Sequence, residues 1–267
     1  MKRTGREQGI LPLEIDLPSS LKELKIVTLA DFHIGDPLCD INRVKEIIKE
    51  IKDTPNLYAI INGDILNNAT KNSVSNSYGE VLSPRQQMLY AVELFEPIKD
   101  KILGVISGNH EYRTDKETDS NLLWDFAYHL DLIDRYTTDG ILFFIRFGEL
   151  NKKKTNGKGK RKVCYTIYAT HGSRAGKANT AVPLKNIVFS DIYITSHKHR
   201  PQQEWGLYFL PDTRNNTVQE IEQLFIVTGA TMKYGGYALR KIYEPAPSTR
   251  NSIIILSGDK KFINAYQ

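Results

Sequence analysis

Cysteine is scarce in this sequence: Cys39 and Cys164 are the only two among 267 residues, and they lie far apart without a paired-cysteine motif. The scarcity excludes a disulfide framework and a zinc site built from thiolates. Unpaired cysteines are typical of proteins in reducing compartments. We therefore expect a cytoplasmic protein.

Long hydrophobic runs are also missing. No stretch approaches the roughly 20 apolar residues that a membrane helix requires, and residues 1–16 lack the apolar core of a secretion signal. We expect a soluble chain that is not exported and has no membrane partner. With 40% hydrophobic and 25% charged residues, the composition is that of an ordinary globular protein, which excludes collagen-like, mucin-like and wholly disordered classes.

Positive charge is in excess, but one segment holds most of it. The formal net charge is +5, and residues 151–162 carry seven cations and no acid, so the rest of the chain has a charge of −2. The seven cations are Lys152, Lys153, Lys154, Lys158, Lys160, Arg161 and Lys162. We interpret residues 151–162 as the basic loop of a hairpin between two apolar runs. A DNA or RNA partner would be contacted through Lys152–Lys162.

Short apolar, β-branched runs alternate with helical patterns along much of the chain, which favours a layered α/β fold. The runs predict strands at 25–30, 57–61, 102–106, 163–169 and 191–195. Helices are expected to begin after Asp40, Ser83 and Asp119, where a capping residue precedes apolar residues spaced by three and four. In such folds the ligand site lies beyond the carboxyl ends of the strands.

Each of the five strands ends at residues of the types that bind metal ions. They are Asp31, His33, Asp64, Asn109, His110, His171, His197 and His199. Imidazoles mixed with carboxylates and one amide suit Mn²⁺, Fe²⁺, Ni²⁺ or Zn²⁺ better than Ca²⁺ or Mg²⁺. The set is too large for one tetrahedral ion, and two ions that share a carboxylate form a hydrolytic site for phosphoesters. We interpret His129, on the third helix, as structural.

The ordered motifs resemble those of the calcineurin-like metallophosphoesterase superfamily. They are ADFHIG (30–35), NGD (62–64), GNHE (108–111), THG (170–172) and SHKH (196–199). The resemblance implies a four-layer αββα sandwich, in which two mixed β-sheets lie face to face and helices flank them. Because the motifs run from residue 31 to residue 199, two independent domains would divide the site. We therefore expect one domain over residues 1–267, with residues 1–24 as an N-terminal extension.

The resemblance also implies a role for each motif residue. The first metal would be held by Asp31, His33 and His199, and the second by Asn109, His171 and His197. Asp64 would bridge the two ions, and His110 would stabilise the transition state and protonate the leaving oxygen. We expect two divalent ions, Mn²⁺ before Fe, Ni or Zn. One departure from the family pattern is Ser196, where glycine often precedes the final histidine pair; it removes no ligand.

The motifs indicate the type of reaction more closely than they indicate the substrate. Phosphoprotein phosphatases resemble GDxVDRG at the second motif, and this chain has GDILNNAT, without the arginine. The first motif, ADFHIG, is closer to the ADxHLG of SbcD-type DNA repair exonucleases, although residues 201–267 leave no room for their usual capping domain. We therefore predict a phosphodiesterase that acts on nucleic acid, a nuclease. The alternatives are a phosphatase or phosphodiesterase for small nucleotides or phosphoproteins and, weakest, an inactive fold used as a binding scaffold.

Four residues near the motifs are candidates for substrate contacts. Arg113 and Arg174 follow GNHE and THG, and an arginine binds phosphate with two parallel hydrogen bonds. Tyr234 and Tyr237 lie in a glycine-containing segment and have rings on which a base can stack. The alternative interpretation is that the arginines are ordinary surface groups and the tyrosines are packing groups.

Overall fold

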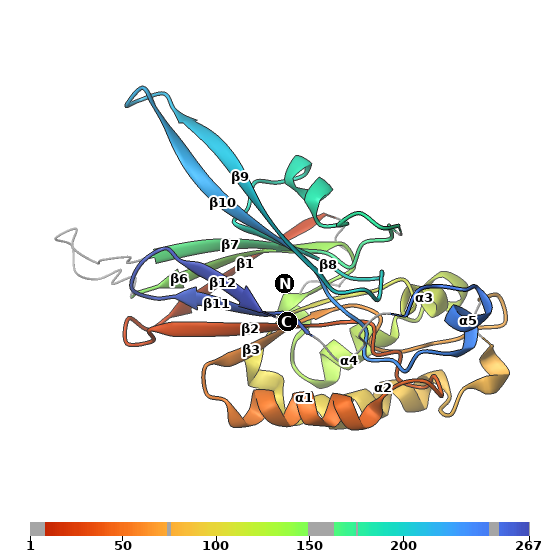
Figure 1. The fold of residues 1–267 in the computed structure, drawn as a ribbon. Coiled ribbons are helices and arrows are strands. Elements are labelled where there is room, and N and C mark those ends of the chain that lie inside the picture. The colour runs from red at the N-terminus through yellow and green to blue at the C-terminus, as the bar shows by residue number, and fades with distance from the viewer. Residues whose placement is uncertain (1–8, 74–75, 149–162, 175, 246–250, 267) are drawn as a thin grey trace.

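Two six-stranded mixed sheets form the centre of the computed structural model, which describes residues 9–73, 76–148, 163–174, 176–245 and 251–266 (Figure 1). The first sheet has the order β1 (Ile10–Leu17), β6 (Gly140–Phe147), β7 (Val163–Ala169), β8 (Ile192–Thr195), β10 (Thr217–Val227) and β9 (Gln202–Asp212). The second has the order β12 (Ile263–Tyr266), β11 (Ile253–Ser257), β2 (Glu23–Leu29), β3 (Leu57–Asn62), β4 (Ile102–Ile106) and β5 (Tyr136–Thr137). From β2 to β5 the pairing is parallel.

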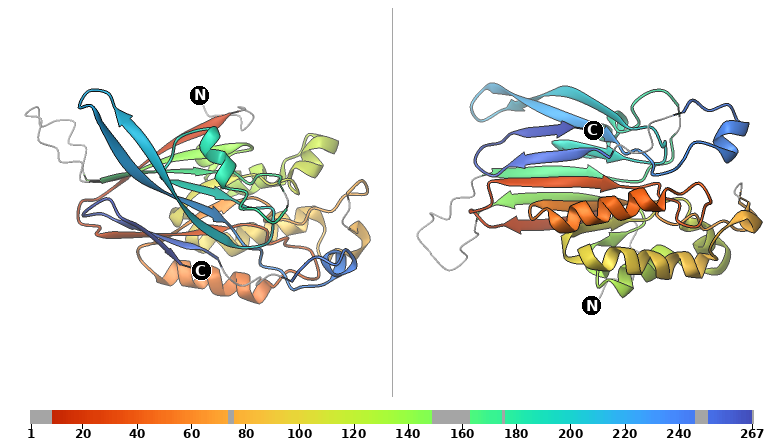
Figure 2. Two further views of the ribbon diagram at one scale, coloured as in Figure 1. Left: turned by 45° about the horizontal axis from the view of Figure 1, so that its top comes forward. Right: turned by 60° about the horizontal axis from the view of Figure 1, so that its bottom comes forward.

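Three helices cover the outer face of the second sheet (Figure 2). They are α1 (Ile41–Asp53), α2 (Pro84–Phe95) and α4 (Leu122–His129). α1 and α2 begin directly after the predicted caps Asp40 and Ser83, whereas α4 is capped by Asn121, and Asp119 instead ends the helix Tyr112–Thr118 in a left-handed conformation. The Asp40 side chain accepts the Arg43 N–H, and Ser83 forms a capping box with Gln86, so both caps satisfy backbone groups that the first turn leaves unpaired. The short helices α3 (Tyr112–Thr118) and α5 (Gly236–Arg240) lie on loops beyond the strand ends.

The two sheets bury a common core between them. Leu24 and Ile26 of β2 and Phe143 and Ile145 of β6 are fully buried in it. A smaller cluster, including Tyr193, lies on the outer face of the first sheet beside the 3₁₀ helix η4 (Val182–Asn186). Further 3₁₀ turns are η1 (Ser77–Gly79), η2 (Glu96–Lys101) and η3 (Ile133–Arg135). The expected α/β sandwich of two mixed sheets with helices is confirmed.

Part of the expected N-terminal extension belongs to the first sheet. Ile10–Leu17 pairs in parallel with β6, and Leu11 and Leu17 are buried. β6 and β7 form the antiparallel hairpin that the sequence predicts, but its basic loop, Lys152–Lys162, lies outside the described residues. In the described ranges, no helix has both the length and the apolar character needed to cross a membrane.

The buried hydroxyl of Tyr165 is one of the groups that join the two sheets, and its removal is a test of the fold. Tyr165 of β7 is fully buried; its hydroxyl lies 2.7 Å from the Ser257 carbonyl and accepts the Phe262 N–H at 2.9 Å. Tyr165→Phe removes the buried hydroxyl and its hydrogen bonds, so we expect the free energy of unfolding to fall by about 1–3 kcal/mol. Urea denaturation measures the change. Tyr78→Phe, at an 88% exposed tyrosine, is the control, and equal midpoints for the two variants would contradict the assignment.

Candidate metal centre

The site lies where the carboxyl ends of β2, β3, β4, β7 and β8 converge. Asp31 and His33 follow β2, Asp64 follows β3, Asn109 and His110 follow β4, and the three remaining histidines follow β7 and β8. The backbone is left-handed at five of these positions, where non-glycine residues are uncommon: Asp31, His33, Asp64, His197 and His199 have φ between 50° and 69°. Such a concentration of strained positions is typical of functional sites.

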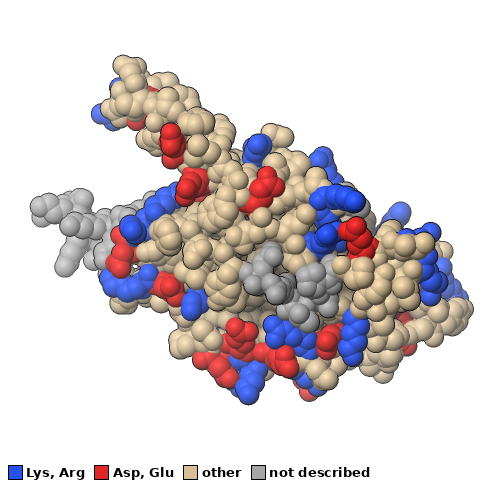
Figure 3. All heavy atoms as spheres, viewed as in Figure 1, with Lys and Arg blue, Asp and Glu red and all other residues tan. Residues whose placement is uncertain are grey.

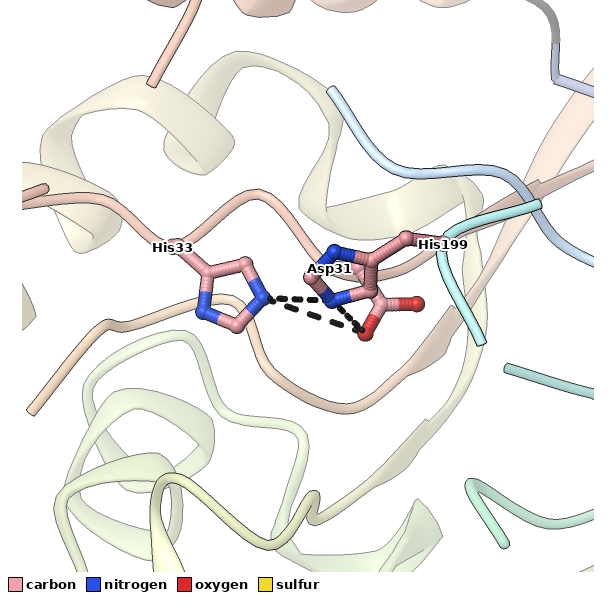
Figure 4. A group of neighbouring side chains, drawn as sticks. All are labelled: Asp31, His33 and His199. Carbon is pink, nitrogen blue, oxygen red and sulfur yellow. Dashed lines mark hydrogen bonds and ion pairs between the residues drawn. The ribbon is translucent and has the colours of Figure 1, made fainter. Parts of the chain in front are cut away.

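Asp31, His33 and His199 form one group of side chains whose donor atoms point toward one another (Figure 4). His33 Nε2 lies 3.0 Å from His199 Nε2, and Asp31 Oδ1 lies 3.3 Å from His199 Nε2 and 3.9 Å from His33 Nε2. The other oxygen of Asp31 accepts the backbone N–H of His197 at 3.0 Å. These are the residues that the resemblance assigns to the first metal.

A second group combines Asp64 with His171 and His197. His171 Nε2 lies 3.2 Å from Asp64 Oδ2 and 3.1 Å from Asn109 Oδ1, and His197 Nδ1 lies 2.7 Å from the same Asn109 oxygen. His171 Nδ1 lies 2.7 Å from the Asn62 carbonyl, which orients the ring. The structure thus brings together the four side chains that the resemblance places around the second metal.

His110 lies between the two groups. Its Nδ1 is 3.2 Å from Nδ1 of His33, and its backbone N–H donates to Asp64 Oδ1 at 2.8 Å. On the other side of the ring, Arg113 Nη2 lies 2.8 Å from His110 Nε2, and Arg113 Nη1 donates to the Asn67 carbonyl at 3.0 Å. The turn after β4 and the first turn of α3 therefore hold an imidazole and a guanidinium side by side at the edge of the centre.

Two glycines allow the β3 and β4 loops to approach each other. A Cβ on Gly108 would lie 2.1 Å from Asp64 Oδ1 and 2.3 Å from the Asp64 backbone nitrogen. Gly63 has φ of 85°, and a Cβ there would lie 2.6 Å from His171 Nδ1. Any larger residue at either position would displace Asp64 or His171, so both glycines belong to the site although neither bears a ligand atom.

Three polar residues that our sequence reasoning left without a role support the ligands. The buried carboxylate of Glu111 accepts the backbone N–H groups of Asp64, Leu66 and Gly108. The Asn62 amide donates to the Ser196 hydroxyl at 2.6 Å, so the serine that replaces the family's glycine ties the final histidine loop to β3. Glu111 and Asn62 belong to the motifs GNHE and NGD, and this membership was the sequence signal that could have identified them as part of the site. Asn68, the third, donates to the His110 carbonyl at 2.8 Å.

The electrostatics of the centre favour positive charge beside the two aspartates. Burial acts to raise the pKa of Asp64, but the neighbouring His171 and His110 hold it well below its usual range. Burial disfavours the charged ring of His171, yet the Asp64 carboxylate outweighs it and raises the pKa of His171 to about 10. Asp31 raises the pKa of His199 against burial in the same way. For His110, burial dominates and lowers the pKa to about 4.

The donor set fits divalent ions. Asp31 Oδ1 and Asp64 Oδ2 are buried carboxylate oxygens without a hydrogen-bond partner, one facing each group of histidines. Their ion-pair contacts are with His199 Nε2 at 3.3 Å and His171 Nε2 at 3.2 Å, and a bound cation would further offset the cost of burying the two negative charges. Imidazole, carboxylate and amide donors without a thiolate match the ligands of borderline divalent metals.

The other candidate residues lie in different surroundings. Arg113 contacts His110 as described, whereas Arg174 is an exposed residue of the loop after His171. Tyr234 is 44% exposed, and its hydroxyl donates to the Tyr243 carbonyl at 2.6 Å. Tyr237 lies in α5, and its side chain is outside the described part of the structure. His129 is exposed at the end of α4, distant in sequence from the motif loops.

Solved structures with a similar arrangement include a Pseudomonas putida nuclease named MPE, with 11% identity, a TM-score of 0.35, and coverage of 90% of this chain and 87% of that one. Vps29 from Chaetomium thermophilum has 10% identity, a TM-score of 0.38 and coverage of 91% and 96%. A Staphylococcus aureus structure described as that of a 5'-nucleotidase in complex with alpha-ketoglutarate has 12% identity, a TM-score of 0.34 and coverage of 82% of this chain and 58% of that one. A comparison with curated proteins gives no match.

The family comparison bears directly on the motif loops. The model of the family described as calcineurin-like phosphoesterase matches residues 24–229, which is more than half of the chain and contains all the residues of the two donor groups. Members of this family are generally hydrolases that use divalent metals. The chain belongs to the calcineurin-like phosphoesterase family.

Proposed function

We propose that this protein is a two-metal phosphodiesterase that acts on nucleic acid. The observation that supports the hydrolytic site is the pair of donor groups, each with a buried carboxylate oxygen that faces histidine rings and accepts no hydrogen bond. Asp31, His33 and His199 would hold one ion, and His171 and His197 with Asn109 would hold the other. Asp64 would be shared, since its carboxylate lies within 4.8 Å of a ring nitrogen of His33, a ligand of the first ion, as well as of ring nitrogens of His171 and His197. A binding scaffold needs none of these donors, so their presence favours an enzyme.

The two ions would supply Lewis-acid stabilisation of the phosphoryl charge and lower the pKa of water. Residues of the chain would do the rest. His110 would donate a hydrogen bond or proton to the leaving oxygen, and Arg113 beside it would bind a phosphate oxygen. An anionic substrate beside His110 would raise its pKa from about 4 toward neutrality, by the effect that Asp64 already has on this ring.

The choice of a nucleic-acid substrate rests on sequence observations. The second motif lacks the arginine of phosphoprotein phosphatases, and residues 151–162 carry seven cations. Small nucleotides are the second candidate, favoured by the near-neutral charge of the chain outside that segment. An activity panel with added Mn²⁺ separates them: bis-p-nitrophenyl phosphate, p-nitrophenyl phosphate, single-stranded DNA and duplex DNA. Hydrolysis of p-nitrophenyl phosphate alone would contradict the proposal.

Metal stoichiometry tests the shared role of Asp64. We expect the purified protein to bind two divalent ions and Asp64→Ala to weaken both sites, whereas His33→Ala or Asn109→Ala weakens one. Calorimetry with Mn²⁺ and elemental analysis measure this. A fully active protein with one ion, or an Asp64→Ala variant that retains both, would overturn the assignment.

Replacement of His110 tests its role in the reaction itself. General acid catalysis typically contributes about 10²–10⁴-fold, so His110→Ala should lose rate on that scale while still binding two ions. The loss should be smaller for esters with good leaving groups, which need less protonation. His129→Ala, at an exposed histidine of α4, is the control and should keep full activity. Equal losses for good and poor leaving groups would indicate a positioning role.

Deletion of Lys152–Lys162 tests the nucleic-acid contact. Each phosphate that a protein neutralises steepens the log–log salt dependence of duplex binding by about 0.9. Closing the hairpin with a short glycine turn should therefore weaken DNA binding and flatten that slope, measured by fluorescence anisotropy at several salt concentrations. Hydrolysis of bis-p-nitrophenyl phosphate should not change. Unchanged affinity and slope for both DNA and RNA would favour the small-nucleotide alternative.

A further inference from the structure

The hairpin of β9 and β10 extends well beyond the rest of its sheet (Figure 1). β8 pairs with β10 only over Leu224–Val227, so residues 217–223 of β10 are paired with β9 alone among the described residues. A two-stranded ribbon is marginally stable in water unless something packs against it. The space-filling view shows this projection as mainly uncharged, with a few acidic and basic side chains (Figure 3).

Large apolar side chains line one face of β9, from the point where the hairpin leaves the rest of the sheet into its projecting part. Trp205, Leu207 and Phe209 are 43%, 51% and 56% exposed, and alternate residues of a strand share a face. Leu224, directly opposite Trp205 on β10, is fully buried between the two sheets. The exposed face therefore continues the inter-sheet core outward, past the region that the second sheet covers.

The backbone groups of the same three residues point to the open edge of β9. The Leu224 N–H donates to the Asp191 carbonyl beside β8, so the backbone N–H and C=O groups of Leu224 point away from β9. Antiparallel ladders alternate, and therefore residue 205, opposite Leu224, and residues 207 and 209 direct their N–H and C=O groups outward. In the described part of the chain, β9 pairs with β10 only. Trp205, Leu207 and Phe209 thus form an open, hydrogen-bonding apolar edge.

The opposite edge of the hairpin, formed by β10, carries charged residues that protect it from pairing with another strand. There the outward residues of β10 include Glu220 and Glu222, and charged residues on an edge oppose pairing. β9 has such protection only at its ends. Pro211, near the tip, has no N–H to donate, and the Gln203 side chain donates to the Ala265 carbonyl at the base. The unprotected stretch runs from residue 204 to residue 210.

We propose that β9 is a homodimer interface, in which the β9 edges of two copies of this chain pair in antiparallel fashion about a two-fold axis at Leu207. In this register Leu207 lies opposite its own symmetry mate, and Trp205 lies opposite Phe209. An isologous contact requires such self-complementarity, and aromatic and aliphatic cross-strand pairs stabilise sheets. No two acids lie directly opposite each other, because Glu204 faces Leu210 and Asp212 faces Gln202.

The exposed area sets the expected strength. At roughly 200 Å² for a large side chain, the five apolar residues from Trp205 to Leu210 expose about 450 Å² per copy, or about 900 Å² for a pair. Stable interfaces bury about 1,200–2,000 Å² in total, so this dimer should be reversible. The new backbone hydrogen bonds convert the two-stranded projection into a four-stranded one.

Oligomeric state against protein concentration is the decisive measurement. Analytical ultracentrifugation should show a monomer–dimer equilibrium, and Leu207→Lys, which sets two cations opposite each other, should raise the dissociation constant at least tenfold. Val218→Lys is the matched control, because Val218 is 61% exposed on β10 of the same hairpin but away from the β9 edge. A monomer at all concentrations, or equal effects of the two lysine variants, would overturn the proposal in favour of a partner of different sequence.

Cross-linking tests the register. Hydrogen-bonded pairs in antiparallel sheets have Cα atoms about 5.5 Å apart, within the range that a disulfide spans. In a Cys39→Ser, Cys164→Ser background, Leu207→Cys should give a covalent dimer when copper-phenanthroline oxidises the two thiols, and Val218→Cys should not. A cross-link at Val218 but not at Leu207 would contradict β9 pairing.

Discussion

The buried carboxylate of Glu111 is the contact on which the geometry of the centre depends. It accepts three backbone N–H groups, from Gly108 in its own loop and from Asp64 and Leu66 in the loop after β3, at 2.9–3.0 Å. Those loops come from neighbouring parallel strands, and a buried N–H without a partner is costly, so one side chain joins them at three points. Burial raises the pKa of Glu111 to about 7.

Around that contact the loops are built by close approach. Gly108 packs against Asp64 with no space for a Cβ, Gly63 packs against His171, and the Asn62 amide bonds to Ser196 across the two sheets. Each of these groups lies beside a candidate metal ligand, and none of them is itself a candidate ligand. The left-handed backbone at Asp31, Asp64 and the final histidines is maintained by this surrounding packing. The precise placement of the candidate metal ligands thus depends on neighbouring residues that are not ligands themselves.

Sequence reasoning predicts the strands that end at the site and the residues after them, because buried parallel strands are short apolar runs with polar residues at their carboxyl ends. β4, for example, spans the expected residues 102–106, and α1 begins directly after Asp40. The supporting roles of Glu111 and Asn62 depend on contacts between loops 47 and 134 residues apart along the chain. Periodicity within a segment carries no information about such contacts. β1 was missed because Ile10–Leu17 alternates apolar residues with Pro12, Glu14 and Asp16, which is the pattern of a half-buried strand and not of the continuous apolar runs that predicted the other strands.

The β9–β10 hairpin was also missed. Its position places the proposed dimer contact away from the candidate metal centre. Its residues 205–210 are continuously apolar and mostly exposed. Strand prediction from an apolar pattern assumes that the apolar residues are buried, which these are not. β9 begins three residues after His199 and runs away from the centre, and β10 returns to it at Val227. Leu207 lies eight residues beyond His199, and an extended chain rises about 3.3 Å per residue. Pairing at that edge would leave the donor groups open to substrate while it stabilises the two strands that lead from them.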